Sequence, residues 1–101
     1  MRSYLISNNA EMISGLRLAG IEGEFADKKE DVIRLINKAK DDEKIGLILI
    51  DRELFLLCEK YIHTFAMKNQ LPVIAEIPNI NTINELSVTD KYIKETVGIS
   101  L

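Results

Sequence analysis

The segment 45–50 constrains the fold more than any other part of the chain. It reads IGLILI, so it is apolar at nearly every position, and Asp51 follows it directly. A strand that is apolar throughout is buried on both faces, which is typical of strands in parallel sheets. The segment therefore predicts a parallel sheet that carries helices on its faces.

Short apolar runs alternate with helical patterns along most of the chain. Further strands are predicted at 4–6, 21–25 and 73–77, and the two glutamates of 21–25 favour a position at the edge of the sheet. Strands joined by helices imply right-handed crossovers between parallel neighbours. We therefore expect an α/β fold, a small doubly wound sandwich with a four-stranded parallel sheet in the order 2-1-3-4. Helices should cover both faces, as in a receiver-like or flavodoxin-like topology.

Several side chains predict where the helices begin and end. Asn8 and Asn9 can cap the first helix, and Gly20 can end it with a positive φ. A capping box is predicted from Asp27 to Glu30, and Asp51 can cap the third helix. Two apolar helix faces follow from the spacing: Val32, Ile33, Ile36 and Ala39 on the second helix, and Leu54, Cys58, Tyr61, Ile62 and Phe65 on a continuous third helix.

Length and composition fit a single folded domain. The chain has 101 residues, of which 47% are hydrophobic and 29% are charged. We expect one α/β domain over 1–101, with a core at 1–78 and a C-terminal segment at 79–101. A final helix is predicted between Thr82 and Gly98, although Ser87, Val88 and Thr89 interrupt its apolar pattern.

Charge and cysteine content exclude some classes of function. The net charge of −3 makes nucleic acid a poor partner, because an acidic domain gains nothing from phosphate attraction. The one cysteine, Cys58, cannot form an intrachain disulfide, which suits a reducing cytosolic compartment. The longest apolar run is too short to cross a bilayer, so no direct membrane insertion is expected.

The ends of the predicted strands offer little chemistry. The loop Ser7-Asn8-Asn9 contains no glycine, which excludes a dinucleotide or phosphate loop of the usual kind. Asp51 occupies the position of a receiver domain's phosphoacceptor, but no acidic residue follows the first strand to hold a divalent cation. A cap is therefore the favoured role for Asp51.

The remaining reactive side chains are isolated in the sequence. His63 is the one histidine and has no second ligand at metal-binding spacing, so a structural or solvent-facing role is favoured. Cys58 is expected to be a buried core thiol. The sequence therefore predicts no catalytic, cofactor-binding or metal-binding residues. Two alternatives stay open: a receiver-like signalling domain, and a small-molecule site near Ser7, Asn8 and Asp51.

Apolar residues accumulate around a proline-bearing loop late in the chain. Ile77, Ile80, Ile83 and Leu86 exceed what a four-stranded sandwich readily buries. They predict either an exposed patch that binds a protein or a closed end of the core, and the two readings are equally favoured.

Three stretches of the sequence resemble a known family. The segment 15–23 reads GLRLAGIEG and is similar to a characteristic stretch of the F subunit of V-type and archaeal-type rotary ATPases. Segments 45–50 and 71–78 resemble the third and fourth strands of that family, and the resemblance spans essentially the whole chain. It implies an accessory component of the central rotor stalk that is not itself an enzyme.

The resemblance also implies partners and a location. The F subunit binds the long coiled coil of the D subunit, and the stalk turns inside the A/B hexamer that handles ATP. The complex couples ATP hydrolysis or synthesis to H⁺ or Na⁺ transport, with this component cytoplasmic and peripheral to the membrane. In that family the C-terminal segment is often mobile and linked to regulation. Together with the apolar surplus, this predicts a partner-binding surface at Ile77, Ile80, Ile83, Leu86, Tyr92, Ile93 and Val97.

Overall fold

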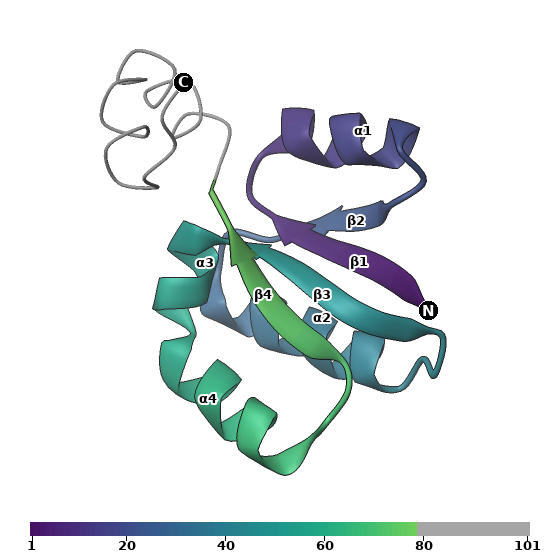
Figure 1. Ribbon diagram of the computed structural model, residues 1–101. Coiled ribbons are helices and arrows are strands. Elements are labelled where there is room, and N and C mark those ends of the chain that lie inside the picture. The colour runs from purple at the N-terminus through teal and green to yellow at the C-terminus, as the bar shows by residue number, and fades with distance from the viewer. Residues whose placement is uncertain (79–101) are drawn as a thin grey trace, which may run out of the picture.

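Four parallel strands form one sheet in the order β2-β1-β3-β4, as the sequence predicts (Figure 1). The structure is a computed structural model in which residues 1–78 are described. The elements are, in chain order, β1 (Arg2–Ser7), α1 (Ala10–Leu18), β2 (Glu22–Phe25), α2 (Lys29–Lys40), β3 (Ile45–Asp51), α3 (Arg52–Leu57), α4 (Glu59–Lys68) and β4 (Val73–Ile77). The final helix predicted between Thr82 and Gly98 lies outside the described residues.

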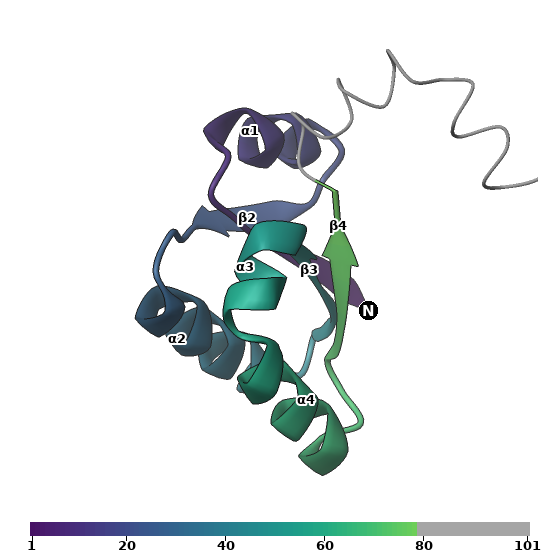
Figure 2. The same ribbon diagram turned by 90° about the vertical axis from the view of Figure 1, so that its left-hand side faces the viewer.

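The helices divide unequally between the two faces of the sheet. Helices α2, α3 and α4 lie on one face and α1 lies on the other, which Figures 1 and 2 show from two sides. The doubly wound α/β architecture is thus confirmed. One end of the sheet gathers the carboxyl ends of the strands, and the opposite end gathers their amino ends together with the turn between α2 and β3.

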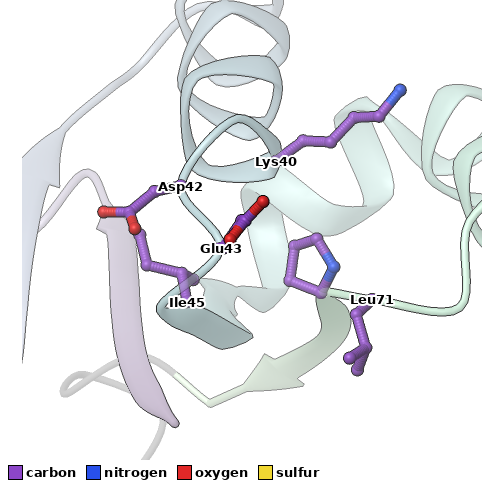
Figure 3. A pocket seen from close by; sticks show the side chains of 6 residues that line it. Lys40, Asp42, Glu43, Ile45 and Leu71 are labelled. Atoms are coloured by element: carbon purple, nitrogen blue, oxygen red, sulfur yellow. The ribbon is translucent and has the colours of Figure 1, made fainter.

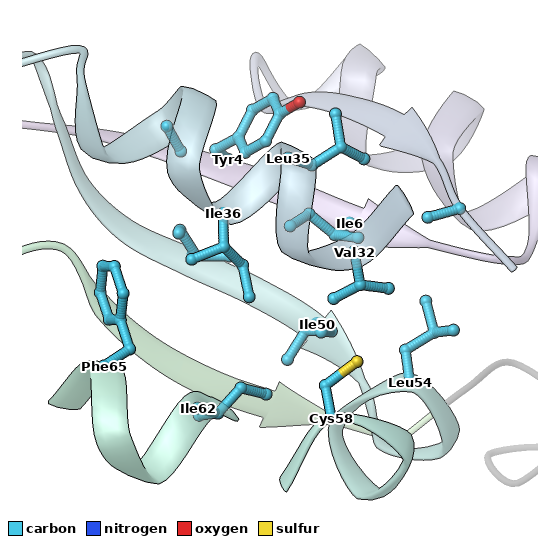
Figure 4. Close-up of a cluster of buried hydrophobic side chains, with 13 residues drawn as sticks. Tyr4, Ile6, Val32, Leu35, Ile36, Ile50, Leu54, Cys58, Ile62 and Phe65 are labelled. Atoms are coloured by element: carbon cyan, nitrogen blue, oxygen red, sulfur yellow. The ribbon is translucent and has the colours of Figure 1, made fainter. Parts of the chain in front are cut away.

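The main core lies between the sheet and the three helices on its more heavily covered face (Figure 4). Ile6 of β1 and Ile50 of β3 are fully buried there, as is Ile36 of α2. Burying one such side chain contributes about 1.5–3 kcal/mol. The cluster comprises Tyr4, Ile6, Ala26, Val32, Leu35, Ile36, Ala39, Ile48, Ile50, Leu54, Cys58, Ile62 and Phe65.

The second face is covered mainly by α1, which packs against β1 and β2. Leu5 is fully buried on this face, and Gly23 of the neighbouring strand lies so close that a Cβ there would be 3.0 Å from the Leu5 Cβ. By strand alternation, the same face receives Leu47 and Leu49 from β3 and Ala75 from β4, and these three are only half-buried. The half of this face over β3 and β4 is therefore the less protected part of the sheet.

The first helix begins and ends as predicted. Asn9 is the N-cap of α1, and its Oδ1 accepts hydrogen bonds from the backbone N–H groups of Glu11 and Met12 at 2.9 and 3.1 Å. Gly20 follows the helix with φ of +87°, a left-handed conformation that a side chain would strain. The glycine thus ends α1 and allows the chain to turn into β2.

Three local predictions were wrong. Helix α2 has Lys28 as its N-cap, without a side-chain bond, so the capping box expected from Asp27 does not form. Leu35 is buried on α2, whereas Ile33, predicted on the apolar face, is half-buried. The helix expected to run without a break after β3 divides at Cys58, whose φ of −113° and ψ of 22° separate α3 from α4. The break lets the chain bend while Cys58 stays in the core.

Candidate functional site

A buried polar pair joins the carboxyl ends of the two central strands. Ser7 of β1 and Asp51 of β3 both have no exposed surface. The Ser7 hydroxyl donates a hydrogen bond of 2.6 Å to Asp51 Oδ2, and the backbone N–H of Asn8 donates one of 2.8 Å to the same oxygen. Ser7 Oγ in turn accepts from the backbone N–H of Asn9 at 2.9 Å. This network fixes the loop from which α1 begins.

The expected role of Asp51 as a helix cap was wrong. Asp51 stands at the N-cap position of α3, but its side chain makes no capping hydrogen bond because it turns to Ser7 and Asn8. Its other oxygen, Oδ1, is buried and has no hydrogen-bond partner within residues 1–78. A carboxylate that is enclosed in this way cannot reach a phosphoryl donor in solution, which argues against the receiver-like reading.

The other reactive groups of the described chain are poorly placed for catalysis. His63 is exposed on α4, and its Nε2 lies 3.8 Å from Glu59 Oε1. Cys58 is buried, and burial raises the pKa of its thiol, which disfavours the reactive thiolate. Among residues 1–78, no three His, Cys, Asp or Glu side chains gather closely enough to hold a metal ion.

The predicted partner-binding residues fall mostly beyond the described chain. Ile77, at the end of β4, is half-buried. The other six, Ile80, Ile83, Leu86, Tyr92, Ile93 and Val97, lie outside the described residues. Whether these side chains form one surface therefore stays a prediction.

Exposed apolar side chains also occur where the sequence did not predict them. Leu71 and Val73, at the start of β4, are 48% and 51% exposed. Leu56 and Leu57 are comparably exposed on α3, and Leu18 at the end of α1 is 92% exposed. Leu56 and Leu57 lie outside the apolar face predicted for the third helix, whereas Val73 belongs to a predicted strand. The structure shows that all of them face outward.

A surface pocket of about 300 Å³ lies beside Leu71, at the amino ends of the strands (Figure 3). Its lining combines apolar and charged side chains: Lys40, Asp42, Glu43, Ile45, Leu71 and Pro72. The turn 41–44 carries four charged residues, and nothing in that pattern indicates a neighbouring apolar wall. Residues 40–45 and 71–72 are far apart in the chain, so only the pairing of β3 with β4 brings them together.

No helix of the described chain is long and apolar enough to cross a membrane. This finding covers residues 1–78.

Comparison with known proteins gives the family. The family model described as ATP synthase (F/14-kDa) subunit matches residues 4–97. A curated relative, the F subunit of the A-type ATP synthase of Methanospirillum hungatei, is 30% identical in an alignment of 101 positions that spans 95% of this chain and 94% of that protein. Both findings agree with the resemblance carried by residues 15–23, 45–50 and 71–78. The chain therefore belongs to the F-subunit family of the A-type and V-type ATPases.

Proposed function

We propose that this chain is a central-stalk component of a rotary ATPase, which binds the coiled coil of the D subunit and turns with it. The chain would not catalyse a reaction itself. It would help to couple ATP hydrolysis or synthesis in the A/B hexamer to the transport of H⁺ or Na⁺. The observation that carries this proposal is the family match, which extends over residues 4–97 and so includes nearly the whole chain.

The geometry of the fold supports a binding role over a catalytic one. In doubly wound folds a ligand binds outside the carboxyl ends of the strands, where the strand order reverses. Here that position is occupied by the Ser7–Asp51 pair, whose side chains are enclosed and hydrogen-bonded to each other. A small-molecule site at this position would have to break that pair. Exposed apolar side chains such as Leu71 and Val73 instead favour contact with another polypeptide.

The partner-binding surface is part of the same proposal. Ile77, Ile80, Ile83, Leu86, Tyr92, Ile93 and Val97 would supply the apolar centre of the contact, and polar residues would surround it. Contacts with the A/B hexamer and with the membrane sector would be indirect or transient. The chain would lie on the cytoplasmic side as a peripheral part of the complex, without a cofactor of its own.

The test is capture of the partner by the purified chain. The chain carries an affinity tag and is co-expressed with the coiled-coil D subunit of the same organism. The two should co-purify, and Ile80→Ala and Leu86→Ala should each weaken the capture. Leu18→Ala is the matched control, because Leu18 is 92% exposed on α1 and is not one of the predicted partner-binding residues.

Two results would contradict the proposal. One is failure of the correctly folded chain to capture the D subunit. The other is hydrolysis of ATP by the chain on its own. Undiminished capture by Ile80→Ala and Leu86→Ala would place the contact elsewhere on the molecule, with the edge strand β2 as the next surface to examine.

A further inference from the structure

The pocket at the amino ends of the strands has an apolar side and a charged side. One wall is apolar, with Ile45, Leu71 and Pro72. The other side is charged and belongs to the turn 41–44, which contains three acidic residues and one lysine. Its volume of about 300 Å³ is at the lower limit for small-molecule sites. The pocket therefore suits a single long side chain better than a cofactor.

The two carboxylates that line the pocket differ in their hydrogen bonding. Asp42 accepts a hydrogen bond from the backbone N–H of Lys44 at 2.9 Å through Oδ1. Glu43 makes no hydrogen bond or ion pair with another described residue and is exposed to solvent. Lys40 extends its ammonium group away from Glu43 (Figure 3), so it does not neutralise this carboxylate. The pocket thus presents unpaired negative charge next to an apolar wall.

We propose that this pocket binds an arginine or lysine side chain from the coiled-coil partner, an inference that rests on the function proposed above. Both side chains have an apolar stem and a cationic head. The stem would pack against Leu71 and Pro72, and the head would meet the carboxylates of Glu43 and Asp42. Charge complementarity of this kind sets the orientation of a docked partner and increases the rate of association.

The surroundings of the pocket agree with a docking surface. Leu71 and Val73 are about half exposed, and Val73 pairs with Leu47 of β3 in the sheet. An apolar patch with charged residues at its border is the usual anatomy of a protein interface. This surface lies at the opposite end of β4 from Ile77. It is therefore separate from Ile77, and the two ends of the strand can be tested separately.

The experiment measures the affinity of the full chain for the D subunit. Glu43→Gln removes the charge and keeps the shape, and it should weaken binding by about two- to fivefold at low salt. Glu43→Lys should weaken it by at least about tenfold, because a like charge would then face the basic side chain. The difference from wild type should shrink in about 1 M NaCl, where the screening length is only about 3 Å.

The matched control is Glu11→Gln, which removes an exposed glutamate from α1. It should bind as the wild type does. Since Glu43 and Glu11 are both exposed, all three variants should keep the wild-type urea midpoint, so a loss of binding reports the contact and not the fold.

The outcomes separate this proposal from the broader one. If the wild-type chain binds the D subunit but Glu43→Lys binds equally well, the basic side chain does not enter the pocket and this inference is wrong. If the wild-type chain does not bind the D subunit at all, both proposals fail. A third result would also overturn the inference. The purified chain would form a dimer in sedimentation, Glu43→Lys would abolish this dimer, and its affinity for the D subunit would stay unchanged. The occupant of the pocket would then be a second copy of the chain.

Discussion

The hydrogen bond between Ser7 and Asp51 can be measured with a double-mutant cycle. Ser7→Ala and Asp51→Ala are made separately and together, and the free energy of unfolding is determined for each. The bond is 2.6 Å long and fully buried, and its acceptor is a carboxylate. Hydrogen bonds to charged groups contribute about 1.5–3 kcal/mol. The coupling between the two substitutions should therefore fall within that range.

Each single substitution should cost more than the coupling alone. Ser7→Ala also leaves the backbone N–H of Asn9 without the Oγ acceptor 2.9 Å away. Asp51→Ala removes the acceptor of the Asn8 N–H at 2.8 Å. A buried donor that loses its partner costs about 1–3 kcal/mol, so together with the lost bond each variant should lose about 2.5–6 kcal/mol. The double variant should lose less than the sum, because the shared bond is then counted once.

The assay is urea denaturation followed by circular dichroism, with the two-state assumption checked by a second probe. A control cycle on Arg2 and Glu22 shows what an exposed pair contributes. Their ion pair is 2.8 Å long, but the side chains are 53% and 70% exposed, so the coupling should stay below about 1 kcal/mol. Additivity within about 0.5 kcal/mol for Ser7 and Asp51 would refute the argument that this pair ties the two strands together.

The further predictions use the same unfolding assay or a simple labelling reaction. Gly20→Ala should destabilise the fold by about 1–2 kcal/mol because φ there is +87°. Gly15→Ala should stabilise the fold by about 0.5–1 kcal/mol, since a Cβ at this position of α1 would meet nothing within 4 Å. The two glycine substitutions should therefore change the free energy of unfolding in opposite directions. Asn9→Ala should cost about 0.5–2 kcal/mol through loss of the α1 cap, and no loss of helix stability would count against that cap. Cys58 should react with iodoacetamide far more slowly in the native protein than in urea, because burial raises the pKa of its thiol. Equal labelling rates in the native protein and in urea would refute the burial of Cys58. Because the thiol of the unfolded chain loses its proton at a lower pH, the free energy of unfolding should decrease as the pH rises above about 8.5.

The architecture could be predicted because it depends on strong, local patterns. The run 45–50 is apolar on both sides of the strand, and it lies at the centre of the sheet as β3. The glutamates of 21–25 indicated an edge strand, and β2 is at the edge. The cap at Asn9 and the turn at Gly20 were also predictable, because each depends on the side-chain chemistry of one residue.

The mistaken predictions concern residues whose role depends on distant partners. Asp51 reads as a helix cap from its own neighbours, but its side chain is occupied by Ser7, which is 44 positions away. The break at Cys58 is equally invisible, because Leu54, Cys58 and Ile62 keep an unbroken helical spacing while the backbone bends. The pocket beside Glu43 requires the pairing of β3 with β4. The strand order predicted from the sequence already places β4 beside β3, but it does not show which side chains of the turn before β3 and of the start of β4 enclose a space.

The Ser7–Asp51 pair links the fold to the kind of function that this chain can perform. A doubly wound sheet offers its best ligand site at the carboxyl ends of the central strands, and a binding protein for small molecules keeps that position open. In this chain, two buried side chains close it and hold the loop before α1 in place. The outer surface remains for recognition, and there the charged Glu43 and the exposed apolar Leu71 line the same pocket. A surface of that kind selects a partner by shape and charge.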